Sequence, residues 1–172
     1  MTRQGGSGAI RNIALVAMLT AVITGQQVAL SFLPNIELVS LFVILFTRHF
    51  GKRTLLVIYV FAVLQGLIYG FGLWMVNYLY VWTILYLVAY ALRGQQSPFV
   101  WAVVLGGFGL LFGALCSPVY LFIGGIGAMA AFFIGGIPFD LLHAAGNFVA
   151  ALLLFRPLDT LFTKLKKQYP FF

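Results

Sequence analysis

Long uncharged apolar segments limit this chain to few kinds of fold. From position 54 to position 92 the sequence contains no charged residue. Of all 172 residues, 63% are hydrophobic and 8% are charged, so too few polar side chains exist to cover the surface of a soluble core. A membrane-spanning helix needs about 20 apolar residues, and the stretch 54–92 is long enough for two. The sequence therefore predicts an all-α integral membrane protein.

Polar turns and glycines divide the chain into six predicted membrane-spanning helices. We expect spans at 13–33, from after Glu37 to about position 50, two within 54–92, at 98–116 and at 138–155. The glycine-rich apolar stretch 119–136 is interpreted as a long outer connection with a short helix. No room remains for a soluble domain, so we predict a single membrane domain over 1–172. It comprises a flexible lead (1–11), a six-helix bundle (12–156) and a basic amphipathic tail (157–172).

The distribution of charge predicts the topology. The net charge of +7 comes from short Lys and Arg clusters between apolar segments rather than from one patch, so we expect no nucleic-acid partner. With six spans, both tails and the turns near 50 and 93 lie on one face, which the positive-inside rule makes cytoplasmic. Counting 119–136 as a seventh span would place the Lys-rich tail outside. We therefore predict a multi-pass protein of the lipid bilayer with both termini in the cytoplasm.

Three polar residues recur along the predicted last helix. Pro138 suits the first turn of a helix, so we expect a loop at 135–136 to lead into it. At about 100° per residue, Asp140, His143 and Asn147 then share one face. Ionisable groups in a membrane usually face a bundle interior or a watery cavity, which makes this stripe a candidate site. Alternatively, Asp140 caps its own helix, and His143 and Asn147 bond to neighbouring helices.

Other candidate residues are expected at the same outer end of the bundle. An outer loop carries Glu37, and aromatic residues follow the glycine turn at 70–72, either as an interfacial belt or as a pocket wall. The predicted substrate-binding residues are Asn35, Glu37, Tyr69, Trp74, Asn77, Tyr78, Asp140, His143 and Asn147.

The sequence lacks the patterns typical of an enzyme. It has no HExxH motif, no serine in a nucleophile elbow and no phosphate-binding glycine loop followed by Lys and Ser or Thr. We therefore predict no catalytic residue, no metal site and no cofactor. Cys116, the single cysteine, lies in an apolar run and is interpreted as a small packing residue.

Four short segments point to a known family: FLPNIE at 32–37, GLIYGFG at 66–72, FGALC at 112–116 and GIPFD at 136–140. With six spans and outer loops over a cavity, the chain resembles the substrate-binding S component of energy-coupling factor (ECF) vitamin transporters. The resemblance implies a bacterial cell-membrane protein that binds a vitamin outside and docks on a membrane coupling subunit attached to two ATPases. ATP hydrolysis would then belong to these partners. The family's docking motif, two alanines four apart on the first helix, maps onto Ala17 and Ala21.

The predicted outer face also restricts the substrate. It carries two acids, Glu37 and Asp140, and no Lys or Arg, which disfavours strongly anionic vitamins such as pantothenate, biotin or folate. An aromatic wall with amide side chains favours a bulky, amide-rich ligand, and the resemblance makes cobalamin the first choice. Thiamine, a pyridoxine-type vitamin and a queuosine precursor stay open. The alternative function is a self-sufficient secondary transporter that uses Asp140 or Glu37 for ion coupling.

Overall fold

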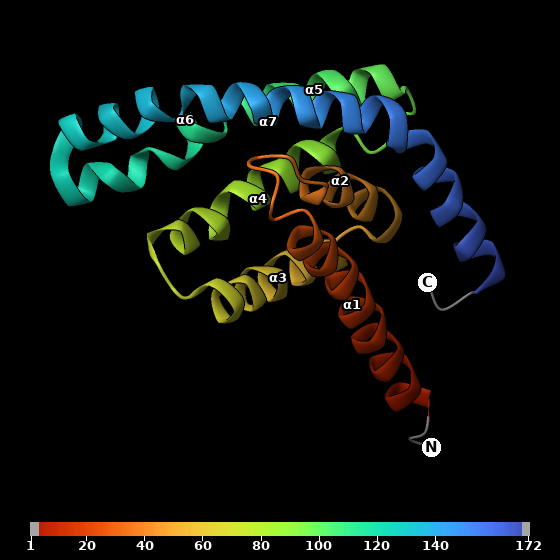
Figure 1. The fold of residues 1–172 in the computed structure, drawn as a ribbon. Coiled ribbons are helices and arrows are strands. Elements are labelled where there is room, and N and C mark those ends of the chain that lie inside the picture. Colours follow the sequence, from red (N-terminus) through yellow and green to blue (C-terminus); the bar gives the residue numbers. More distant parts are fainter. Residues whose placement is uncertain (1–3, 170–172) are drawn as a thin grey trace.

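The computed structural model describes residues 4–169, and no strand occurs among them, which confirms the predicted all-α class. Figure 1 shows α5 lying along α7 as one layer, with the helices from α1 to α4 on one side of it. The helices are α1 (Gln4–Ala29), α2 (Val39–Phe50), α3 (Arg53–Tyr69), α4 (Leu73–Ala91), α5 (Pro98–Leu110), α6 (Phe112–Cys116) and α7 (Pro118–Gln168).

Within the described residues, three helical segments are long and apolar enough to cross a membrane: Gly8–Ala29, Leu73–Ala91 and Pro118–Gln168. The apolar helices α2, α3 and α5 have 12, 17 and 13 residues, fewer than the about 20 that one span needs. Many large apolar side chains lie on the outside of the molecule, for example Phe122, which is 88% exposed. Such a surface is compatible with a lipid environment.

Two predicted turns lie where the sequence placed them. The turn after α3 begins at Gly70, whose φ of +84° is a conformation that favours glycine, and α4 starts three residues later. Ser97 caps α5 by accepting a hydrogen bond from the N–H of Val100, and Pro98 is the first residue of that helix. These residues explain why the chain reverses at both places.

The predicted ends of the bundle were wrong. The lead at 1–11, expected to be flexible, is helical from Gln4 onward, and α1 ends at Ala29. The last helix does not close at Arg156, because α7 continues through Pro157 to Gln168. Phe162, six residues beyond the predicted end of the bundle at 156, is buried and packs edge-on against the rings of two phenylalanines of α2. This apolar packing holds the helix together beyond the proline.

The prediction that 119–136 forms a long outer connection, with a loop at 135–136, was also wrong. The backbone leaves helical geometry only at Gly124 and Gly125, where Figure 1 shows the chain reversing, and α7 is continuous from there. The residues 135 and 136 and Pro138 therefore lie inside a helix, not at its start. In apolar surroundings a helix is favoured even across glycine and proline because it satisfies its own backbone groups. Tyr120 and Phe132 stack across the reversal with ring centroids 4.0 Å apart.

The predicted span 98–116 is interrupted, and its glycines contact α7. Leu111, with φ −92° and ψ 0°, separates α5 from α6. A Cβ added to Gly109 would lie 2.8 Å from the backbone nitrogen of Ala144, and one added to Gly113 would overlap a carboxylate of α7. At Gly107 a Cβ would meet nothing within 4 Å. Gly109 and Gly113 therefore allow α5 and α6 to lie in close contact with α7.

Three of the basic segments lie close together. Arg48 Nε lies 3.2 Å from Oδ1 of Asp159, and its guanidinium donates to the carbonyl oxygen of Arg93 at 2.7 Å. His49 Nε2 lies 2.9 Å from the same Asp159 oxygen, and Lys166 donates to the carbonyl of His49 at 2.7 Å. The turn after α2, the turn after α4 and the last part of α7 are thus tied together.

Candidate functional site

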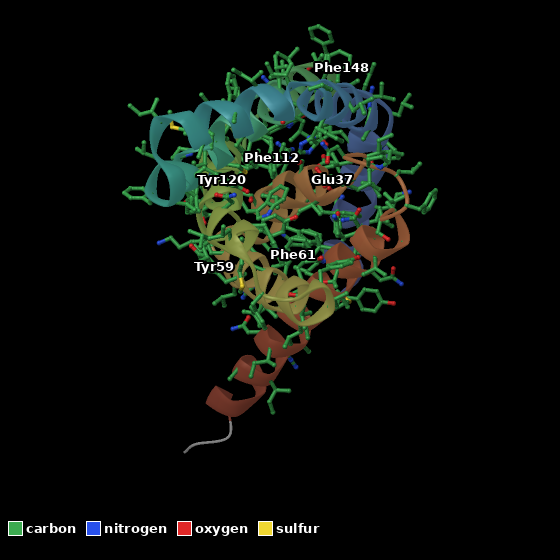
Figure 2. All side chains as sticks on the ribbon, turned by 60° about the vertical axis from the view of Figure 1, so that its left-hand side comes forward. Glu37, Tyr59, Phe61, Phe112, Tyr120 and Phe148 are labelled. Atoms are coloured by element: carbon green, nitrogen blue, oxygen red, sulfur yellow. The ribbon has the colours of Figure 1, made fainter. Side chains whose placement is uncertain are left out.

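Two adjoining cavities lie at the far end of α2 and α3 from these basic segments. The larger cavity, here called the aromatic compartment, has a volume of about 510 Å³. The smaller one, the polar compartment, has a volume of about 300 Å³. Asn35, Tyr78 and Phe112 line both, so the two cavities share a wall. Figure 2 shows Phe112 between Glu37 and Tyr120 beneath the ribbon of α7.

The aromatic compartment lies between α4, α6 and the helical reversal of α7. Its amide and carboxylate side chains are Asn35, Asn77 and Asp140. Oδ1 of Asn77 lies 3.0 Å from the hydroxyl of Tyr80, so this amide is held by its own helix. Aromatic residues form six of its fourteen lining positions: Trp74, Tyr78, Phe112, Tyr120, Phe132 and Phe139.

The polar compartment lies between the end of α1, the loop that follows it and α7. Backbone and side-chain groups of the loop 30–37 form one wall, while Tyr69, Trp82 and His143 contribute from α3, α4 and α7. The loop is fastened to α1 by Gln26, whose side-chain oxygen accepts a hydrogen bond from the N–H of Leu38 at 2.9 Å.

The structure brings the predicted site residues together from four different parts of the chain. Of the nine, only Asn147 lines neither compartment. The aromatic compartment contains Asn35, Trp74, Asn77, Tyr78 and Asp140, and the polar compartment contains Asn35, Glu37, Tyr69, Tyr78 and His143.

Asp140 does not cap its own helix, because it lies in the interior of α7. Its two carboxylate oxygens lie 3.0 and 3.1 Å from the backbone nitrogen of Gly113, which donates to them. Gly113 is the second residue of α6, where a backbone N–H has no partner inside the helix. Asp140 therefore caps a neighbouring helix, while its side chain also lines the aromatic compartment.

Glu37 and His143 join the outer loop to α7. Oε1 of Glu37 lies 3.1 Å from Nε2 of His143 and accepts a hydrogen bond from the hydroxyl of Ser40 at 2.5 Å. Both carboxylate oxygens also accept from the N–H of Ser40, at 3.3 and 3.0 Å. Glu37 and His143 are buried, and buried charged groups require such partners. The pair positions the loop at the polar compartment.

Asn147 has the structural role that the sequence left open. It is 1% exposed, and its amide nitrogen donates to the hydroxyl of Ser40 at 3.2 Å and to the carbonyl of Leu105 at 3.5 Å. These bonds connect α7 with α2 and α5. The prediction that Asn147 binds substrate is not supported by its position.

Several lining residues were not singled out from the sequence. Trp82 was not among the predicted substrate-binding residues, yet it is 2% exposed and lines the polar compartment. Gln27 also lines this compartment, and its place beside Gln26 in an apolar span was a signal for a polar site. Cys116 is buried as predicted, but it also borders the aromatic compartment.

The charge of the site is negative. Glu37 and Asp140 line the compartments, whereas no Lys or Arg is found among the described residues that border them. Across residues 4–169, no group of three or more His, Cys, Asp or Glu side chains could hold a metal ion. The compartments are therefore suited to neutral or cationic organic molecules.

The predicted docking residues lie elsewhere, on the surface of α1. Ala17 and Ala21 are both exposed. Ala17 also borders an apolar groove of about 400 Å³ between α1 and α3, together with Val16 and Leu56. These alanines leave room for a helix of another protein to approach.

Comparison of the chain with protein families, curated proteins and solved structures gives no match.

Proposed function

We propose that this protein is the substrate-binding S component of an ATP-driven ECF vitamin importer in a bacterial cell membrane. The observation that supports it best is the pair of adjoining compartments, which brings eight of the nine predicted site residues together at the end remote from the basic turn after α2. Concave sites with a mainly apolar wall and a few polar groups are typical for small organic ligands.

The proposal includes six spans with both termini in the cytoplasm. α3, with 17 residues, is at the lower limit for a span, and α5 followed by α6 covers the predicted fifth span. The ion pair between Arg48 and Asp159 and the hydrogen bond from Lys166 to the carbonyl of His49 join the basic turn after α2 to the basic end of α7. This proximity supports a single cytoplasmic end. The compartments would then open toward the outside of the cell.

The proposed substrate is a neutral or cationic vitamin, with cobalamin as the candidate that the sequence favours. Its bulk and amide groups suit the aromatic wall and the neighbouring Asn35 and Asn77. The compartments have the size that encloses a drug-sized molecule, so cobalamin would be enclosed only in part. Thiamine, a pyridoxine-type vitamin and a queuosine precursor are smaller candidates.

The alternative, a secondary transporter coupled to ions through Glu37 or Asp140, has less support. Glu37 already holds Ser40 and His143, and Asp140 holds the N–H of Gly113. A carboxylate that couples transport to an ion must exchange its partner during the cycle. Neither carboxylate is available for this without loss of its protein contacts.

Purification from a bacterial membrane that contains an ECF module tests the proposal. We expect a coupling subunit and two ATPases to co-purify with the chain. Ala17→Trp combined with Ala21→Trp should remove these partners, because bulky side chains prevent close helix approach. Ala145→Trp, an equally bulky change at an exposed position of α7, is the matched control and should retain them. A chain that purifies alone and drives uptake with a proton gradient would contradict the proposal.

A further inference from the structure

The polar compartment contains two buried polar atoms without a hydrogen-bond partner among the described residues. One is the indole nitrogen Nε1 of Trp82, a donor, and the other is Oε1 of Gln27, an acceptor. Trp82 is 2% exposed, and both residues line the compartment. A buried donor or acceptor without a partner destabilises a protein unless some other molecule satisfies it.

The acid and the histidine of this compartment already have partners. Glu37 holds His143 and Ser40. The indole of Trp82 is fixed by aromatic neighbours, with ring centroids 5.5 Å from Tyr78 and 5.7 Å from Phe112. Fixed side chains cannot turn to find a protein partner at low cost, so a ligand is the natural source of the missing contacts.

Tyr78 and Phe112 also connect the two compartments. Both residues line the aromatic compartment as well as the polar one. A molecule that occupies both compartments therefore contacts these two rings. Its apolar part would then lie in the aromatic compartment.

We propose that the site takes an uncharged ligand in two parts, a flat ring body in the aromatic compartment and a head group with both an acceptor and a donor in the polar compartment. The acceptor receives the N–H of Trp82, and the donor binds Oε1 of Gln27. A carboxamide has both functions. This inference rests on the outer binding site of the proposed function and specifies its substrate class.

A carboxylate of the same shape fits the compartment poorly. It lacks the N–H that Oε1 of Gln27 requires. It also brings a negative charge near Glu37 without a Lys or Arg among the described lining residues to balance it. The compartment should therefore distinguish an amide from its isosteric acid.

Binding of 2-naphthamide and 2-naphthoate to the purified protein in lipid nanodiscs tests the inference. Both probes carry the same two-ring body, and isothermal titration calorimetry with empty nanodiscs as reference measures their affinity. We expect 2-naphthamide to bind at least tenfold more tightly. Equal affinity for the two probes, or no binding of 2-naphthamide, would overturn the inference.

Trp82→Phe tests whether the polar compartment is responsible for binding the amide group. It removes the N–H but retains a ring, so the affinity for 2-naphthamide should fall about tenfold. The lost ring volume should lower the melting temperature of the ligand-free protein, but the lost donor should add nothing to this effect because it has no protein partner. Trp101→Phe is the matched control: its buried N–H donates to the carbonyl of Gln95 at 3.0 Å, far from both compartments. This change loses the same ring volume and a protein hydrogen bond as well, so it should lower the melting temperature further than Trp82→Phe and leave the affinity unchanged.

Gln27→Met supplies an independent variant if Trp82→Phe fails to fold. It removes the acceptor at similar size and should also weaken 2-naphthamide binding about tenfold. Unchanged affinity in a folded Trp82→Phe or Gln27→Met protein would overturn the assignment. Co-purification of the ATPases does not depend on these probes, so loss of the head-group site and loss of the transporter function are distinguishable.

Discussion

The polar residues of α7 share one buried face but have different partners. Asp140 binds a backbone N–H of α6, His143 a carboxylate of the outer loop, and Asn147 a hydroxyl of α2. Helical periodicity was enough to predict that all three face the interior. Their partners could not be predicted, because Glu37 precedes His143 by 106 positions and only the packing of helices joins them.

At the residue scale, Asn147→Ala should destabilise the protein without weakening ligand binding. The change leaves the carbonyl of Leu105 without this donor and opens a gap beside Ser40, at a cost of about 1–3 kcal/mol. Thermal unfolding of the ligand-free protein measures the effect. Asn12→Ala, the same change at an exposed position of α1, should leave the melting temperature almost unchanged. Equal stability of both variants would show that the Asn147 bonds do not hold the helices together.

At the scale of helices, the sequence predicted positions of turns better than helix ends. Gly70 lies at a turn because it adopts a positive φ, and Pro98 lies at a helix start because its fixed φ suits the first helical turn. Pro138 and Pro157, by contrast, lie within α7, and the glycines at 135 and 136 are helical. Glycine and proline weaken a helix locally, but apolar packing and internally satisfied backbone groups decide whether it ends. That packing depends on distant residues such as Phe46 and Phe162.

The close contact between α5 and α7 leads to a prediction about glycine. Gly109→Ala places a methyl group 2.8 Å from backbone atoms of α7, so the two helices must separate. We expect a loss of about 1–3 kcal/mol of stability. Gly107→Ala, two residues away with open space around it, should be neutral or slightly stabilising because Ala favours helix. Thermal unfolding of the two variants compares them, and a melting temperature at or above that of the unmodified protein for Gly109→Ala would contradict the packing.

At the scale of the whole molecule, the chain has a basic end and an acidic, cavity-bearing end. The sequence predicted that the turns near 50 and 93 and the Lys-rich tail lie on one side, and the structure joins these three segments. The cavities did not, because they arise where α4, α6 and the reversal at Gly124 and Gly125 leave space between them. The number of spans also depends on how the short helices α2, α3 and α5 sit in the bilayer.

The proposed topology predicts the labelling of single cysteines in a Cys116→Ser background. Gly6→Cys and Gln168→Cys should resist an impermeant thiol reagent added to whole cells, whereas Ser31→Cys in the exposed outer loop should react. All three should react after the cells are opened. Labelling of only one terminus in whole cells would mean an odd number of spans and would contradict the six-span arrangement.

The central claim is that the aromatic compartment holds the transported molecule. Mass spectrometry of small molecules retained by the purified protein tests it most directly when a cavity-filling variant is compared with a matched control. Gly136→Phe inserts a ring at a position that lines the compartment, and Gly107→Phe inserts the same ring outside both compartments. We expect one retained molecule in the unmodified protein and in Gly107→Phe, and none in folded Gly136→Phe. Retention of the same molecule by all three proteins would contradict the claim.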